Sequence, residues 1–371
     1  MSKHITEDIK IRTYKSGDEE QIIELLELVF QGWPHFDLNC PPIDHWIWKF
    51  KDNPSQTNLI IVGEIDDRII GCDHSFFTRI KVGSSIMLCR QGLDAAIHPD
   101  FRGIGIYSRI FKMKDELDSK LNIGLTYGAT SNQILIKRGS RTNLPVFPYP
   151  VIIITRINDI NLHMRKNNIR GLWKKYAFHA VRILNKIEVY LTSSPKKPQS
   201  RIEISEVDKF DGQIDIFWSK IKNDYNFITE RSSEYLNWRY CDPRGGGYII
   251  KQAKEDDEII GYIVLRVNNY DKDYPEGYIV DLCTIQSRLY CAETLIAESM
   301  RYFKEQKVNV IYYCIVKGHS YLKLFIKYGF LNFTNKIHIN YTPNKIGGDL
   351  EVFKNSSSEK ILFQYNDLDW C

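Results

Sequence analysis

The order of hydrophobic and polar residues along the chain predicts a mixed α/β protein. Lys10 to Lys15 alternate between apolar and polar side chains, as in a strand. The apolar residues of 20–30 recur three or four positions apart, as on one face of a helix. Later expected elements are a helix at 45–50, strands at 59–64, 68–79 and 93–97, a helix from 106 to about 121, a strand at 123–127 and a helix at 132–137.

The second half of the chain repeats the first at an offset of 190 positions. The matched positions are Trp48 with Trp238, residues 66–71 with 256–261, and Lys137 and Gly139 with Lys327 and Gly329. Three separated matches at one spacing indicate that one fold is used twice. We therefore expect an N-terminal domain at 1–155, a connector at 156–200 and a C-terminal domain at 201–371.

The connector between the repeats is strongly basic. Its apolar residues recur at helical spacing, and Pro195 to Pro198 then end the pattern. Two interpretations remain open. The segment is either an amphipathic helix that packs across the two domains, or a basic helix attracted to anionic lipid or a polyanion.

The stretch from Leu88 to Phe111 carries the most specific chemistry. An apolar strand ends at the turn His98-Pro99-Asp100, and Arg102, Gly103 and Gly105 precede a new helix. The first turn of a helix has unpaired backbone N–H groups at the positive end of its dipole, so phosphate can bind there. Glycine lets the anion approach the backbone closely.

Two common phosphate-binding motifs do not fit this loop. A Walker loop requires Lys and Ser or Thr after its last glycine, where Ile106 and Tyr107 stand. A dinucleotide fingerprint requires a third glycine where Ser108 stands. A plain strand–turn–helix connection without a ligand remains the alternative.

Residues 98 to 106 resemble the coenzyme A loop of the GNAT acyltransferases, whose pattern is Arg/Gln-x-x-Gly-x-Gly/Ala. Arg102 and Gly105 match the pattern, whereas Tyr107 replaces its last small residue. The resemblance implies two tandem GNAT-like domains, each a mixed sheet with helices on both faces. In the second repeat the loop positions become Ala292, Glu293 and Leu295. That copy is therefore expected to be degenerate and not to bind coenzyme A.

The resemblance also implies which residues hold acetyl-CoA. The backbone of Ala95 and Ile97 would pair with the pantetheine arm, and Asn132 would hydrogen-bond it, although Asn132 is equally suited to cap a helix. The expected phosphate cradle comprises Arg102, Gly103, Ile104, Gly105, Ile106, Tyr107 and Ser108.

The acid and base are less evident. Many GNAT enzymes have a general-acid Tyr where Leu135 and Phe325 stand here, and some have a Glu base where Gln91 stands. Gln91 can orient a water or the substrate but cannot take a proton. The remaining candidates for catalysis, each of which also has a structural interpretation, are Asp73, His74, Asp94 and Tyr127.

The chain end carries two carboxylates, Asp367 and Asp369, beside Trp370. We expect this tail either to fold against a cleft between the domains, where its carboxylates would attract an ammonium, or to fray.

Composition narrows the class of protein. The 371 residues carry a formal net charge of +4, which gives no reason to expect nucleic acid as a partner. The 8 Cys form no CxxC pair, so a zinc site is not expected, and no apolar run is long enough to span a bilayer. These features are typical of a cytoplasmic protein.

Together the residues and the resemblance predict an acetyl-CoA-dependent N-acetyltransferase. The acceptor would be a small amine in a cleft between the domains, with an amino sugar among the candidates. Two alternatives stay open. The protein could bind an acyl-CoA or a partner without catalysis, or it could transfer aminoacyl groups to a peptide or lipid.

Overall fold

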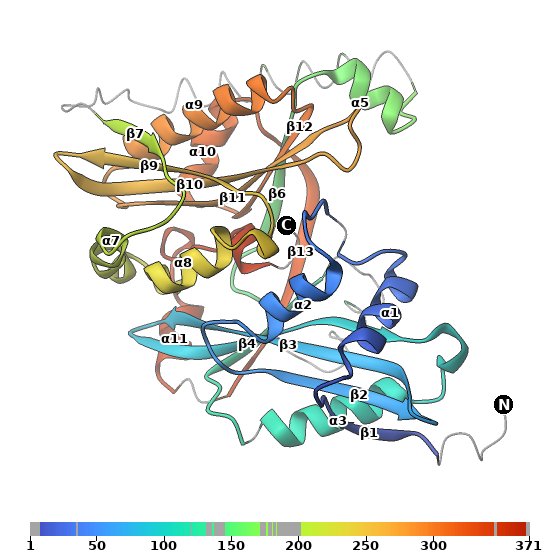
Figure 1. The fold of residues 1–371 in the computed structure, drawn as a ribbon. Coiled ribbons are helices and arrows are strands. Elements are labelled where there is room, and N and C mark those ends of the chain that lie inside the picture. Colours follow the sequence, from blue (N-terminus) through green and yellow to red (C-terminus); the bar gives the residue numbers. More distant parts are fainter. Residues whose placement is uncertain are drawn as a thin grey trace.

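The computed structural model describes residues 8–34, 36–118, 120–130, 145–170, 202–344 and 347–368, together with Ile136, Tyr176, Ala180 and Ile183. Two units of the same element order follow one another along the chain. We call them the first copy, residues 10–130, and the second copy, residues 203–327. Figure 1 shows their sheets one above the other, with α2 and α8 between them. Helix α3 covers the outer face of the lower sheet, and α9 and α10 cover the outer face of the upper one.

The first copy follows the order expected from the sequence. Its elements are β1 Lys10–Thr13, α1 Glu19–Phe30, α2 Pro42–Phe50, β2 Leu59–Ile65, β3 Arg68–Val82, β4 Ser85–Ile97, a 3₁₀ turn at Pro99–Phe101, α3 Ile106–Asp118 and β5 Leu125–Thr130. Strand β4 is longer than expected, because the hairpin after β3 continues its pairing from Val82↔Ser85 to Gly71↔Ile97. The helix expected at 132–137, including Asn132, Lys137 and Gly139, lies outside the described residues apart from Ile136, which is helical.

The second copy repeats that order, with one extra strand, β8. Its elements are β7 Glu203–Glu206, α7 Gln213–Ile221, β8 Phe227–Thr229, α8 Ser233–Tyr240, β9 Ile249–Glu255, β10 Glu258–Asn268, β11 Glu276–Thr284, α9 Leu289–Glu305, β12 Val310–Val316 and α10 Ser320–Lys327. The turns of the two matched hairpins are equivalent, because Asp66, Asp67, Asp256 and Asp257 all have positive φ.

Each copy receives its last strand from the other half of the chain. Strand β6 (Val151–Ile157) follows the first copy but pairs with β12, and β13 (Leu331–Pro343) follows the second copy but pairs with β5. The two exchanged strands also pair with each other. Thirteen strands of the described residues thus form one continuous sheet, and β6 and β13 join its two halves (Figure 1).

The segment expected to be a connector begins inside β6. Arg156 and Ile157 are its last strand residues, and helix α5 (Ile160–Lys166) follows, with the Asp159 side chain accepting a hydrogen bond from Leu162 N–H at its start. Most of the remaining connector, 171–200, lies outside the described residues. The domain boundaries given above stay a prediction.

The two tryptophans matched by the repeat meet at the centre of the molecule. The rings of Trp48 on α2 and Trp238 on α8 stack with their centroids 4.8 Å apart. Trp48 Nε1–H donates to the Trp238 carbonyl at 2.9 Å, and Trp238 Nε1–H donates to the Trp48 carbonyl at 3.1 Å. This reciprocal contact is what a two-fold relation between equivalent residues produces.

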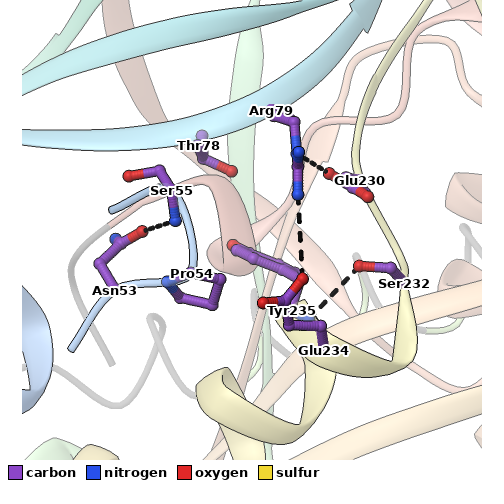
Figure 2. Close-up of a pocket in the computed structure, with 9 residues that line it drawn as sticks. All are labelled: Asn53, Pro54, Ser55, Thr78, Arg79, Glu230, Ser232, Glu234 and Tyr235. Carbon is purple, nitrogen blue, oxygen red and sulfur yellow. Dashed lines mark hydrogen bonds and ion pairs between the residues drawn. The ribbon is translucent and has the colours of Figure 1, made fainter. Parts of the chain in front are cut away.

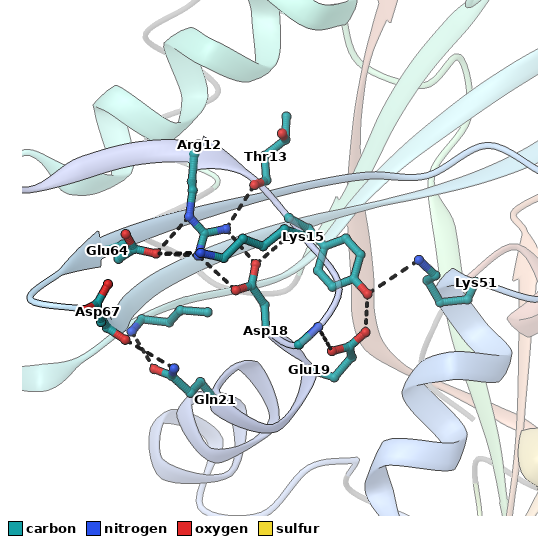
Figure 3. Close-up of polar contacts among 12 residues, drawn as sticks. Arg12, Thr13, Lys15, Asp18, Glu19, Gln21, Lys51, Glu64 and Asp67 are labelled. Carbon is teal, nitrogen blue, oxygen red and sulfur yellow. Dashed lines mark hydrogen bonds and ion pairs between the residues drawn. The ribbon is translucent and has the colours of Figure 1, made fainter.

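Charged groups fasten the start of the chain to the first sheet (Figure 3). The Arg12 guanidinium on β1 bonds both Asp18, which precedes α1, and Glu64 on β2. Asp18 accepts from Lys15 N–H at 2.8 Å, and Glu19 accepts from Gly17 N–H at 2.7 Å. The acidic residues at the start of α1 therefore satisfy loop N–H groups as well as complement the helix dipole.

Candidate functional site

An opening forms in the first sheet where β4 and β5 part. Their parallel pairing runs from Cys89↔Leu125 to Gln91↔Tyr127 and then stops. Beyond it β4 continues to Ile97 alongside β3 alone, whereas β5 continues alongside β13. Within the described residues, β4 from Gly92 to Ile97 therefore has one edge with no neighbouring strand. An amide-containing ligand can pair with such an edge as an added strand would.

The glycine loop lies at the end of this open edge. Gly103 and Gly105 have φ of +82° and +86°, the left-handed region that glycine adopts most readily. Among the described residues, no atom beyond the immediate chain neighbours lies within 4 Å of where a Cβ would stand on either residue, so the space above this backbone is open there. Arg102 is exposed, and its Nε donates to the Ile97 carbonyl at 3.2 Å, which ties the loop to the strand end.

Helix α3 follows the loop directly. Ile106 is buried, and it anchors the first turn against the sheet, while Tyr107 is half-buried and Ser108 is exposed. The first-turn N–H groups of a helix lack intrahelical partners, so this turn and the glycine loop together form a cradle of N–H donors. The residues predicted for the phosphate cradle therefore lie together next to the open edge.

A β-bulge interrupts β4 within the open region. The register shifts between Cys72↔Ala96 and His74↔Leu93, and Asp94 in the bulge has φ of +48°. Its carboxylate pairs with Lys49 Nζ on α2 at 2.7 Å. Burial alone would raise the pKa of Asp94, but the Lys49 ammonium outweighs burial and holds that pKa below its usual range. Asp94 is therefore an ionised residue that stabilises a left-handed backbone position.

His74 is fully buried beside this bulge, and both of its ring nitrogens have partners. Trp46 Nε1–H donates to His74 Nε2 at 3.0 Å, so Nδ1 carries the proton and donates to the Asp94 carbonyl at 3.0 Å. Burial lowers the pKa of His74 to about 4. The geometry is typical of a neutral structural histidine, and it leaves no ring nitrogen for a substrate.

Asp73 points to the other face of the sheet, as expected for the neighbour of His74 in a strand. It forms an ion pair with Lys114 on α3, and both side chains are buried. Burial lowers the pKa of Lys114, with Asp73 opposing that change. A second pair, Arg90 with Asp118 at 2.6 Å, lies on the same face. Asp73 thus helps fasten α3 to the sheet, away from Asp94 and His74.

Tyr127 lies at the last paired position before the opening. Its hydroxyl donates to the carbonyl of Asp367 at 3.1 Å and lies 3.5 Å from Gln91 Oε1. The segment that carries Asp367, residues 361–368, is buried between the two copies, and we call it the tail segment. The Asp367 carboxylate accepts hydrogen bonds from Thr229 and from Gln364 N–H. Its burial raises its pKa. Asp369 lies outside the described residues.

The second copy has no comparable loop. Helix α9 begins at Leu289 directly after Arg288, and Ala292 and Leu295, at two of the predicted loop positions, are buried core residues of this helix. Glu293 forms an ion pair with Lys327 on α10. These positions therefore lie within the helix, and the junction before it, residues 285–288, contains no glycine, so the described geometry offers no glycine cradle in the second copy.

A groove of about 450 Å³ lies between the copies near the end of α2. Its wall residues are Lys51, Asp52, Asn53, Pro54, Gln56, Glu234 and Trp238. A small cavity of about 10 Å³ adjoins it and shares Asn53, Pro54 and Glu234 (Figure 2). That volume suits a single water molecule. Trp238 in the groove wall stacks on Phe76 of β3, whose cross-strand partner on β4 is Gln91.

Two family models match the chain. A model described as Acetyltransferase (GNAT) domain matches residues 10–131, and one described as Acetyltransferase (GNAT) family matches residues 214–330. These ranges coincide with the two copies of the fold. The chain is a tandem GNAT-domain protein.

Solved structures share the fold across both copies. A Saccharomyces cerevisiae N-myristoyltransferase with bound myristoyl-CoA has a TM-score of 0.60 at 11% identity, and the match covers 96% of this chain and 86% of that one. An Enterococcus faecalis protein described as a probable N-acyltransferase has a TM-score of 0.59 at 11% identity, over 91% and 73% of the two chains. A GCN5-related N-acetyltransferase from Anabaena variabilis has a TM-score of 0.57 at 10% identity, over 89% and 72%. No curated protein matches the sequence.

None of the helices in the described residues has the length and apolar character needed to cross a bilayer. No group of three or more His, Cys, Asp or Glu side chains in this part of the chain is arranged to hold a metal ion.

Several residues at the site were not expected from the sequence. Lys49, which pairs with Asp94, is the one charged residue in the aromatic stretch 46–50 of α2. A charge at such a position is the sequence signal that could have identified it. Gln364, considered below, is likewise a lone amide within the apolar run ILFQY. Lys114 gave no such signal, because α3 carries charged residues at many positions.

Proposed function

We propose that this GNAT-domain protein is an N-acyltransferase that uses acetyl-CoA as donor and a small amine as acceptor. The observation that carries the proposal is the open edge of β4 next to the glycine loop. The pyrophosphate of coenzyme A would bind the N–H groups of residues 103–108, and the pantetheine arm would pair with the backbone of Ala95 and Ile97.

The proposed reaction is direct transfer. The neutral amine nitrogen attacks the thioester carbonyl carbon, a C–N bond forms, the C–S bond breaks, and the proton lost by nitrogen ends on sulfur. Backbone N–H groups of the open β4 edge, near Gly92 to Ala95, would stabilise the oxyanion. Tyr127, at the last paired position before the opening, would break its hydrogen bond to the Asp367 carbonyl, donate its proton to the departing thiolate and take up the proton that nitrogen loses. Asp94 and Lys49 would hold the bulge that orients those N–H groups.

The groove between the copies supports the choice of a small cationic acceptor. Asp52 and Glu234 line it together with one base, Lys51, and Asp52 pairs with Arg244 at 2.7 Å. The Glu234 side chain is 65% exposed and pairs with the half-exposed Arg79 at 3.9 Å, so an incoming ammonium would compete only with a solvent-exposed ion pair. A volume of about 450 Å³ suits a molecule of the size of an amino sugar.

The direct test measures thiol release from acetyl-CoA with a panel of amino sugars, polyamines and dipeptides. We expect turnover with at least one amine, and Tyr127→Phe to lower kcat by about 10²-fold with acetyl-CoA affinity unchanged. Octanoyl- and myristoyl-CoA test the length of the acyl group. Acyl-CoA binding without thiol release for any amine would instead indicate a non-catalytic binding protein.

Glu234→Gln tests the acceptor groove. Loss of this carboxylate should raise the KM for a cationic amine by up to about fivefold while the KM for acetyl-CoA stays constant, because an exposed charge contributes about 1 kcal/mol or less. Glu351→Gln, on the exposed face of α11 (Asp349–Lys354), is the matched control. An equal change of acceptor KM in both variants would remove the groove from the proposal.

A further inference from the structure

The second copy has its own opening, at the place equivalent to that of the first. Strands β11 and β12 pair in parallel from Glu276↔Val310 to Ile279↔Tyr313 and then part. Beyond this point β11 continues along β10, and β12 continues along β6. The last paired residue on the second strand is a tyrosine in both copies, Tyr127 and Tyr313.

The tail segment fills this second opening. Gln364, with 0% of its surface exposed, bonds both backbone groups of Leu282 on β11. Its Oε1 accepts from Leu282 N–H at 2.9 Å, and its Nε2 donates to the Leu282 carbonyl at 3.0 Å. Gln364 Oε1 also accepts from the Tyr313 hydroxyl at 2.8 Å. One amide thus pairs with the strand edge through both a donor and an acceptor, as a neighbouring peptide group would.

We propose that the tail segment is a built-in ligand of the second copy and that Gln364, docked there, is a positioning residue for Tyr127 in the first copy. Its amide makes the strand-edge hydrogen bonds that an amide of a cofactor arm would otherwise make. The second copy therefore takes no acyl-CoA, and its opening serves as an anchoring site for the tail.

Only a few residues of the tail segment separate Gln364 from the group that contacts Tyr127. Three residues after Gln364, the Asp367 carbonyl accepts from the Tyr127 hydroxyl, and the Asp367 carboxylate turns back to Gln364 N–H at 2.8 Å. One short turn of chain therefore contacts the equivalent tyrosines of both copies. Displacing Gln364 would move the acceptor that orients the Tyr127 hydroxyl.

A buried ion pair supports the anchor. Arg231 and Asp281 both have 0% side-chain exposure and lie 3.0 Å apart. Asp281 also accepts from Gln364 Nε2 at 3.2 Å and from the Tyr262 hydroxyl at 2.8 Å. Because a buried carboxylate requires such donors, the network favours the docked position of Gln364 over an empty opening.

The test replaces Gln364 by Leu in the full-length protein and reads amide hydrogen exchange at Leu282. We expect the protection of this amide to fall by about tenfold or more, because its hydrogen-bond partner is removed. Gln306→Leu, the same chemical change on the exposed end of α9, should leave it unchanged. Unchanged protection in Gln364→Leu would overturn the proposal, whether or not the protein transfers acyl groups.

The second measurement, of enzyme kinetics, rests on the proposed function. Gln364→Leu should lower kcat by about tenfold and leave the KM for acetyl-CoA within about twofold, since the glycine loop is untouched. Combined with Tyr127→Phe, it should cause no further loss, because both changes act through one hydroxyl. Fully additive losses would show that Gln364 does not act through Tyr127.

Tyr313→Phe covers the case in which Gln364→Leu fails to fold. It removes a single hydrogen bond to Gln364 Oε1, so the fold should persist while exchange at Leu282 rises. Titration of wild-type protein with acetyl-CoA should give one site per chain. Two sites per chain would contradict a permanently filled second opening.

Discussion

Gly103 and Gly105 combine a left-handed backbone with open space above it. A residue with a Cβ at either position would have a strained left-handed backbone but no steric clash with the described residues. The effects of strain and of charge can therefore be separated by comparing a neutral with a charged side chain. The loop can accept an anion because no other part of the described chain covers these two residues within the reach of a Cβ.

Gly105→Glu should abolish acyl-CoA binding, whereas Gly105→Ala should weaken it less, because its single methyl group fills only part of the space that the anion needs. Both lower the free energy of unfolding by roughly 1–2 kcal/mol, the usual penalty for a left-handed residue with a Cβ. Only Glu adds a charge that repels the pyrophosphate. Calorimetric titration with acetyl-CoA and denaturant unfolding measure the two effects. Equal binding by the two variants would place the pyrophosphate elsewhere.

His74 makes stability depend on pH. Its pKa is about 4 in the fold against 6.5 for the free side chain, so the unfolded chain binds the proton more strongly. The contribution of neutral His74 is therefore complete above pH 6.5 and is lost as the pH falls from 6.5 to about 4. We expect His74→Gln to flatten the fall in unfolding free energy over this range, relative to wild type, in denaturant titrations at successive pH values. Parallel curves for the two proteins would contradict a buried neutral His74.

At the scale of elements, α2 and α8 hold the two copies together through equivalent residues. The stacked rings of Trp48 and Trp238 lie between the sheets of the two copies. The two residues are 190 positions apart in the sequence. The exposed surface of Trp48 is 1% and that of Trp238 is 9%, so almost the whole of each ring is removed from water. Helix α2 also supplies Lys49 to the β4 bulge, so this packing bears on the site as well as on stability.

Trp48→Ala should lower the free energy of unfolding by about 3–5 kcal/mol, as expected for deleting a buried aromatic ring. Trp238→Ala in the same chain should add less than its separate effect, because the stack and one of the two reciprocal hydrogen bonds are already lost. Trp218→Ala on α7 is the control, and its effect should add to that of Trp48→Ala. Denaturant unfolding of single and double variants measures the difference.

At the scale of the whole molecule, the exchange of β6 and β13 makes the halves interdependent. Strand β5 is completed by β13 across Thr130↔His338 to Leu125↔Pro343, and β12 is completed by β6. Neither copy can complete its sheet from its own stretch of chain. The tail segment adds a second link, since it starts beside Phe227 and reaches Tyr127.

Residues 1–200 and 201–371, produced separately, should each fail to give a stable folded domain. Each fragment lacks the strand that covers a central edge, and an uncovered apolar edge favours aggregation. Co-production of both fragments should restore a stable complex. Limited proteolysis and size-exclusion chromatography provide the measurement, and a stable monomeric fragment 1–200 would contradict the exchange.

Much of the fold followed from local patterns. The alternation in β1, the acidic start of α1 and the Asp66-Asp67 turn between two apolar stretches depend on residues next to each other, so the sequence was sufficient to predict these elements. The repeat at 190 positions correctly matched Trp48 with Trp238. It did not show that their rings stack, because a spacing in sequence carries no information on the axis that relates two domains.

In the candidate site, too, only the parts that are close together in the sequence could be predicted. The glycine loop could be located from the sequence because a turn of a few residues contains all of its backbone donors. The roles of Asp73 and His74 could not, because these adjacent residues face opposite sides of one sheet and are paired with Lys114 on α3 and Trp46 on α2.

The sequence by itself determined the elements, the repetition and the phosphate-type loop, since each depends on backbone preferences within a short stretch. Only the tertiary structure decided which strand completes which copy, where Gln364 binds and what Tyr127 contacts. Those pairings join residues more than 50 positions apart, and burial selects among many partners that the sequence alone leaves equivalent.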